Sequence, residues 1–89
     1  MAKVIFTRNL ERYLDCPPQA VQASTVAEAL TAAFAGNQRL AGYILDDQQR
    51  LRKNIAIFVD GTLISDRLRL SDPVQSSSEI YVLQALSGG

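Results

Sequence analysis

Hydrophobic residues follow the two-residue period of a β-strand in some segments and the period of an α-helix in another. In the first strand-like segment, Val4 and Phe6 fall on one face and Ile5 on the other. In the segment at residues 55–59, Ile57 falls on one face and Phe58 on the other. Runs rich in β-branched and aromatic residues predict strands at residues 3–7, 19–23, 55–59, 62–64 and 79–83.

One amphipathic helix is predicted after Thr25. Thr25 and Glu28 have the spacing of a capping box, in which each side chain accepts a hydrogen bond from a backbone N–H at the helix start, and Gly36 is placed to end the helix. Apolar residues at helical spacing form one stripe facing a core: Val26, Ala29, Leu30, Ala33 and Phe34. Residues 37–45 are few and interrupted by Gly42, so no second full helix is expected.

The order of these elements predicts the fold class. Asp60-Gly61 between two strand segments is a two-residue hairpin signal, and the first and last strands would lie side by side in parallel. We therefore expect an α+β chain of the β-grasp type, with a mixed sheet of four to five strands packed on one main helix. The domain would span residues 1–83, with a tail at 84–89. A ferredoxin-like fold would need a second full helix.

Composition and charge disfavour some classes of partner. An 89-residue chain with 47% hydrophobic and 20% charged residues is typical of one globular domain. Nine basic and nine acidic residues cancel, so no overall field favours nucleic acid as a partner. The N-terminal region has neither the apolar core of a signal peptide nor a run long enough to cross a membrane. We expect a cytoplasmic protein with no membrane partner.

The supply of catalytic side chains is small. The sequence has no histidine and one cysteine, which disfavours self-contained catalysis and fits a reducing compartment. Cys16 as a nucleophile would have no neighbouring base, so an inert thiol is the better interpretation. Asp46 and Asp47 are adjacent acids without further ligand spacing, and no metal site is expected.

The sequence closes on Gly88-Gly89, which permits two interpretations. Small residues are common in frayed termini. Glycine is also the residue best suited to threading a backbone end through a narrow slot, because it lacks a Cβ.

Four segments together carry a family resemblance. They are residues 3–6, the capped helix start at 25–30, the strand and turn at 54–61, and the closing strand at 79–83 that runs to Gly88-Gly89. This arrangement resembles the ubiquitin-like sulfur carriers of the MoaD/ThiS family. The resemblance implies that an E1-like enzyme, using ATP and Mg²⁺, adenylates the carboxylate of Gly89, which then becomes a thiocarboxylate. Leu86, Ser87 and Gly88 would complete the tail. The chain itself would bind no cofactor and would be no enzyme, although it could serve as the small subunit of a sulfur-transferring synthase.

The resemblance also implies a docking face. Apolar residues on the sheet face opposite the core would contact the E1-like enzyme and a sulfur-accepting synthase or large subunit; these are Ile5, Phe58, Leu63, Tyr81 and Leu83. Packing of these residues under residues 8–18 or 37–50 is the alternative.

The sequence indicates two types of pathway that could receive the sulfur. Residues 37–54 are longer than in thiamin-type carriers, which favours a cysteine-type or molybdopterin-type pathway. The segment ends in Arg50, Arg52 and Lys53, either a solvated strand edge or a patch for an acidic partner surface. A ubiquitin-like protein modifier and a plain interaction module remain alternatives. A Gly-Gly end that needs no proteolytic maturation favours the carrier.

Overall fold

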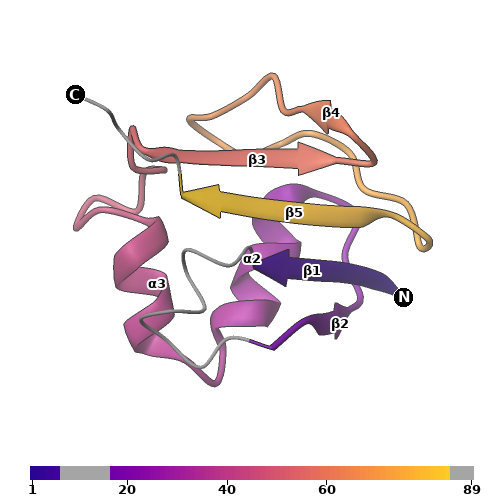
Figure 1. The fold of residues 1–89 in the computed structure, drawn as a ribbon, viewed down its shortest axis with the longest axis horizontal. Coiled ribbons are helices and arrows are strands. Elements are labelled where there is room, and N and C mark those ends of the chain that lie inside the picture. The colour runs from indigo at the N-terminus through magenta and orange to yellow at the C-terminus, as the bar shows by residue number, and fades with distance from the viewer. Residues whose placement is uncertain (7–16, 85–89) are drawn as a thin grey trace.

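A mixed five-stranded sheet with two helices against one face forms the part of the protein that this computed structural model describes, residues 1–6 and 17–84 (Figure 1). Predictions about Cys16 and the tail residues Leu86 to Gly89 lie outside these residues. In chain order the elements are β1 (Ala2–Phe6), β2 (Gln19–Val21), α2 (Val26–Phe34), α3 (Gln38–Ile44), β3 (Ile55–Val59), β4 (Thr62–Leu63) and β5 (Glu79–Gln84).

The strand order is β2-β1-β5-β3-β4, and it confirms the predicted β-grasp arrangement. β1 and β5 are parallel neighbours, whereas the pairs β1–β2, β3–β5 and β3–β4 are antiparallel. β5 therefore occupies the centre of the sheet, hydrogen-bonded along both edges. It extends to Gln84, one residue beyond the expected end of the strand.

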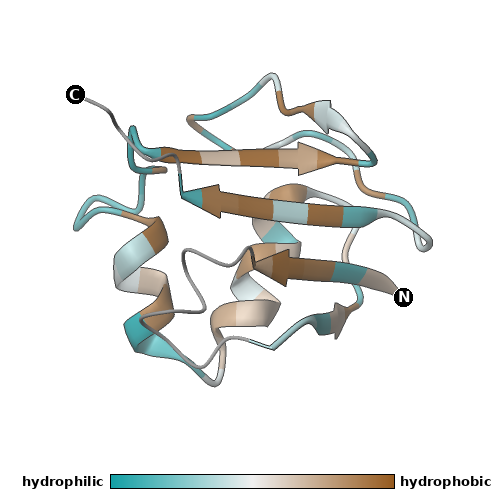
Figure 2. Ribbon diagram, viewed as in Figure 1, coloured by the Kyte–Doolittle hydropathy of each residue, from teal (hydrophilic) through white to brown (hydrophobic). Residues whose placement is uncertain are grey.

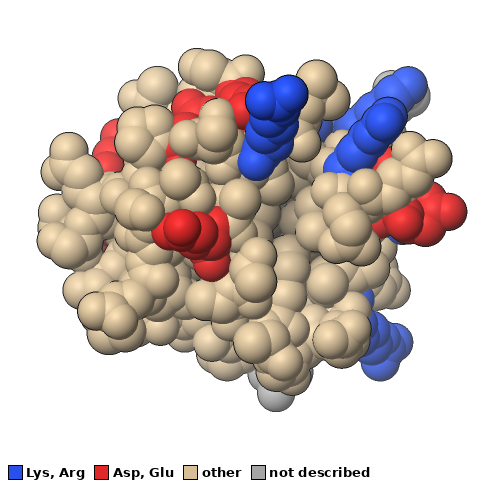
Figure 3. Space-filling view, turned by 180° about the vertical axis from the view of Figure 1, so that it is seen from behind, with Lys and Arg blue, Asp and Glu red and all other residues tan. Residues whose placement is uncertain are grey.

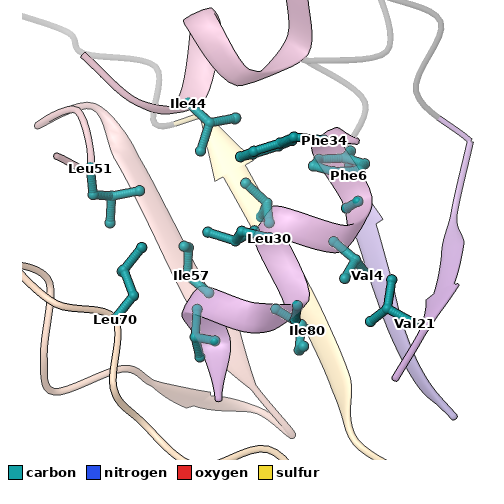
Figure 4. Packing of buried hydrophobic residues seen from close by; sticks show 14 of the residues in the cluster. Val4, Phe6, Val21, Leu30, Phe34, Ile44, Leu51, Ile57, Leu70 and Ile80 are labelled. Carbon is teal, nitrogen blue, oxygen red and sulfur yellow. The ribbon is translucent and has the colours of Figure 1, made fainter. Parts of the chain in front are cut away.

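The core lies between the sheet and the two helices. Alternate residues of the three central strands point to the helices and are buried, as the period-two pattern predicted: Val4, Phe6, Ile55, Ile57, Ile80 and Val82. Figure 4 shows Leu30 and Phe34 of α2 and Ile44 of α3 packed among them. The three central strands are hydrophobic along most of their length, whereas the connections are largely polar (Figure 2). No helix within residues 1–6 and 17–84 is long and apolar enough to cross a membrane.

Residues 37–45, which were expected to be too short and too interrupted for a second full helix, contain the seven-residue helix α3. Asn37 caps α3, because its Oδ1 accepts a hydrogen bond from the backbone N–H of Leu40 at 3.1 Å. Leu40 and Ile44, four residues apart, are both fully buried against the core. Gly42 lies on the exposed side, where its weak helix propensity is offset by the burial of the opposite side.

The start of α2 is capped as predicted, with one change of partner. Thr25 Oγ1 accepts a hydrogen bond from the backbone N–H of Glu28 at 3.2 Å. The Glu28 carboxylate returns to the backbone N–H and the hydroxyl of Ser24, both at 2.8 Å, instead of to the N–H of Thr25. These bonds hold the pKa of Glu28 below its usual value, the Ser24 backbone N–H being the main cause.

Replacing Thr25 with alanine is expected to destabilise the protein by about 1 kcal/mol, because the N–H of Glu28 loses its acceptor. For a domain of this size that corresponds to a fall in Tm of about 4–8 °C. Thermal unfolding followed by circular dichroism measures it. Thr31→Ala in the same helix is the matched control, because the Thr31 hydroxyl donates a hydrogen bond to the carbonyl of Ala27 within the helix and alanine has the higher helix propensity. An equal loss in both variants would contradict the capping role.

The turn between β3 and β4 is tied to the first residues of β5. Asp60 and Gly61 have positive φ values of 50° and 85°, as the predicted two-residue hairpin requires. The Asp60 carboxylate accepts hydrogen bonds from the backbone N–H of Glu79 at 2.9 Å and from the buried hydroxyl of Ser78 at 2.8 Å. The backbone N–H of Glu79 is the main cause that lowers the pKa of Asp60.

Stability is expected to fall as the pH falls below about 5. A carboxylate with a lowered folded-state pKa stabilises the fold above its unfolded pKa and loses this contribution as the pH falls through the folded value. Glu28, Asp46, Asp60 and Asp66 all have lowered pKa values, and no histidine titrates between pH 5 and 8. Tm measured from pH 7 to pH 3 should be flat at first and then decline. Asp60→Asn should lower Tm at pH 7 and flatten the decline; an unchanged decline would argue against the Asp60 contribution.

Candidate functional site

The sheet face that points away from the helices is the candidate site. Because successive side chains of a strand point to opposite faces, burying Val4, Ile57 and Ile80 leaves their sequence neighbours on this outer face. Those neighbours include the residues predicted to contact a partner.

The strand register aligns four predicted docking residues in one row. Ile5 of β1 is paired with Tyr81 of β5, Tyr81 with Phe58 of β3, and Phe58 with Leu63 of β4. Directly opposed side chains lie about 4.5–5.5 Å apart at Cβ in the two antiparallel pairs, and the parallel ladder sets Ile5 beside Tyr81. The row therefore crosses four of the five strands as one continuous apolar strip.

Exposure differs along this strip. Leu63 is 53% exposed and Tyr81 37% exposed, whereas Ile5 and Phe58 are half-buried between their neighbours. All four share one sheet face, as predicted. Contiguous apolar side chains on the outer face of a sheet are typical of an interaction site.

β5 connects this strip to the end of the chain. Tyr81 and Leu83 both point outward, and Leu83 is half-buried opposite Ala56 of β3. Two residues of strand advance about 7 Å, so apolar surface continues from the strip toward the last strand residue, Gln84. At the other end of β5 the outer face turns polar, where Lys3 is paired with Glu79.

The basic segment at residues 50–53 forms neither a strand nor a strand edge. It connects α3 to β3, and Leu51 pairs with Leu45 in an isolated bridge and is buried. Arg52 Nε donates a hydrogen bond to the carbonyl of Gly42 at 3.0 Å. Sequence reasoning did not place Arg67 with this segment, yet its guanidinium donates to the carbonyl of Arg52 at 3.0 Å. No local sequence pattern signals this contact, which depends on the path of the chain after β4.

A family model described as the ThiS family matches residues 11–89. The match includes β2, β3, β4 and β5 and extends through both closing glycines. No curated protein sequence matches the chain significantly.

Solved structures match the whole fold at low sequence identity. SAMP1 from Haloferax volcanii is 19% identical with a TM-score of 0.83, and 99% of this chain and 98% of that chain are covered. The small archaeal modifier protein 1 from Methanosarcina acetivorans is 24% identical with a TM-score of 0.79, at 99% and 95% coverage. A chain of the Amycolatopsis orientalis BexX/CysO complex is 17% identical with a TM-score of 0.81, at 100% coverage of both chains.

Proposed function

The chain belongs to the ThiS family, and from this premise we propose that it is a sulfur carrier whose working group is the carboxylate of Gly89. In this proposal an E1-like enzyme adenylates Gly89, and the acyl adenylate is converted to a thiocarboxylate that donates sulfur in biosynthesis. The recipient would be of the cysteine type or the molybdopterin type, since residues 37–54 are longer than in thiamin-type carriers.

One observation carries the proposal: the central strand leads from an apolar outer face directly to the Gly-Gly tail. Tyr81 and Leu83 lie on the outer face of β5, and the family match extends from this strand through Gly88 and Gly89. A partner that binds the outer face would therefore hold the domain at a fixed distance from the point where the tail enters its active site.

The chemistry divides between the two proteins. A carboxylate is a poor electrophile, so an oxygen of Gly89 must first attack the α-phosphorus of ATP and displace pyrophosphate. Sulfur then attacks the carbonyl carbon, and AMP leaves with the C–O bond electrons. The activating enzyme would supply ATP, Mg²⁺ and catalytic groups, whereas this chain would supply an unhindered reacting end and the surface that positions it.

Intact-mass spectrometry tests the proposal. The chain is incubated with its cognate activating enzyme, ATP, Mg²⁺ and a sulfide source. Replacement of one oxygen by sulfur should add about 16 Da, and omission of ATP should prevent the gain. A chain that keeps its original mass in the complete mixture would overturn the carrier proposal.

A protein modifier is the second candidate, because two of the similar structures carry the name modifier protein. The same activated Gly89 would then acylate lysine amines and form isopeptide bonds. Mass spectrometry of tryptic peptides from cells that express the tagged chain separates the two candidates. Lysines that carry a remnant of the chain indicate a modifier, whereas a thiocarboxylate without conjugates indicates a dedicated carrier.

A further inference from the structure

A basic groove lies between the connection that precedes β3 and the turn that follows β4. It is an open hollow of about 780 Å³, and the described residues that line it include four cations and one carboxylate: Arg50, Arg52, Lys53, Arg67 and Asp46. The chain as a whole is neutral, so this excess of positive charge is local. In the view from behind, the visible Lys and Arg side chains lie in the upper and right-hand parts of the molecule (Figure 3).

Hydrogen bonds to the backbone fix two of the cations. Arg52 Nε donates to the carbonyl of Gly42, and Arg67 donates to the carbonyl of Arg52, both at 3.0 Å. Asp66 stabilises the turn that carries Arg67. Its Oδ1 accepts hydrogen bonds from the backbone N–H groups of Leu68 and Arg69 at 3.2 and 3.0 Å. Two cationic groups are therefore held in place before any partner arrives, which lowers the entropic cost of binding.

The Asp46 carboxylate offsets one of the four positive charges of the groove and is also held by the backbone. Asp46 Oδ1 accepts hydrogen bonds from the N–H groups of Gln48 and Arg50, both at 2.9 Å. Within residues 1–6 and 17–84, Lys53 has neither an ion-pair nor a hydrogen-bond partner. The groove thus keeps a net positive charge from its four cations and one carboxylate.

An apolar side chain lies among these charges. Leu68 is 76% exposed, the most exposed large hydrophobic residue of the described chain, and it lines the groove with Arg67 and Leu51. A small inorganic anion would make no use of it. A peptide segment with carboxylates around an apolar residue would use both the charges and Leu68.

The groove adjoins a second hollow that lies at the end of β5. Arg52 and Asn54 line both the groove and this second hollow of about 480 Å³, which Gln84 and Tyr43 also border. A protein that received the tail beyond Gln84 would therefore lie beside the basic groove.

We propose that this groove binds an acidic segment of the protein that receives the tail, with carboxylates facing Arg50, Lys53 and Arg67 and an apolar side chain against Leu68. The identity of that protein rests on the proposed carrier function. The contact adds a second docking surface, near the end of β5 and distinct from the apolar strip on the outer sheet face.

Titration of the full-length ¹⁵N-labelled chain by NMR tests the groove without any activating enzyme. The probe is a blocked peptide with one leucine between two runs of three glutamates, compared with its glutamine counterpart and with inorganic phosphate. The acidic peptide should shift amides of residues 46–54 and 66–69, and its affinity should fall as salt is raised. The glutamine peptide and phosphate should leave the chemical shifts of these amides unchanged.

Two lysines provide a matched pair of variants. Lys53→Gln should weaken the peptide about two- to fivefold, as loss of one exposed charge does, whereas Lys3→Gln at the far end of β1 should leave its affinity unchanged. The double reversal Arg50→Glu with Lys53→Glu should weaken it about tenfold or more. None of these changes removes a side chain that hydrogen-bonds the backbone.

Three results would overturn the proposal: no shifts in the groove, equal weakening by Lys3→Gln, or equal shifts with phosphate, which would indicate a simple anion site. Because the titration contains no ATP or enzyme, its failure is distinguishable from failure of the mass-spectrometric test of the carrier. If the chain gains 16 Da but does not bind the peptide, the proposed carrier function stands and the proposed binding by the groove is overturned.

Discussion

A chain that lacks Gly89 is expected to gain no thiocarboxylate, and Gly89→Ala is expected to slow the gain of 16 Da about a hundredfold. Deletion moves the carboxylate back by one residue, or about 3.5 Å of extended chain, away from the reacting phosphate. A methyl group on the last residue would press against a slot shaped for a bare backbone, and a misplacement near 1 Å is enough for a loss of this size.

Time courses of intact mass with the activating enzyme measure this effect. Ser87→Ala is the control, because it changes the tail without moving the reacting carboxylate. The chain that lacks Gly89 should still compete with the parent chain for the enzyme, since its outer sheet face is unchanged. A gain of 16 Da in the absence of Gly89 would place the chemistry elsewhere in the chain.

Replacing Tyr81 with alanine is expected to raise the KM for the activating enzyme about 30-fold while kcat stays nearly constant. Tyr81 is the central exposed aromatic of the strip, paired with Ile5 on one side and Phe58 on the other. Truncation of such a residue at the centre of an interface typically costs about 2 kcal/mol, and each 1.4 kcal/mol is a factor of ten. The contact is remote from the reacting atoms, so it is lost equally from ground state and transition state.

Thr31→Ala is the control for this prediction. Thr31 is exposed on α2 in the other layer of the molecule and does not line the hollow beside Gln84. Steady-state kinetics should show little change for Thr31→Ala. An unchanged KM for Tyr81→Ala would remove the outer face from the docking surface, and a fall in kcat alone would indicate a role in the chemical step.

Local patterns predicted most of the fold and of the outer face. The alternation of Ile57 and Phe58 sets which side chain is buried, and the Asp60-Gly61 turn sets the register that pairs Phe58 with Leu63. Both signals lie within a few residues, so they can be read from the sequence. The parallel pairing of β1 with β5 also followed, because the order of elements leaves few other topologies.

The missed features depend on contacts between distant segments. α3 forms because Leu40 and Ile44 are buried against the sheet, which outweighs the poor propensity of Gly42. The basic groove needs Arg67 beside Arg52, a pairing set by the path of the chain after β4. Such contacts have no local signature, so the sequence showed the run of cations without the fourth member of the groove.

The central position of β5 has a mechanical consequence. Its ladders with β1 and β3 run along both edges of the strand. A pull along the axis of β5, such as a partner that holds the tail would exert while the domain diffuses away, therefore acts as shear on many hydrogen bonds at once. An edge strand pulled sideways would instead open one bond at a time. We therefore expect the domain to stay folded when its last strand is pulled along the strand axis.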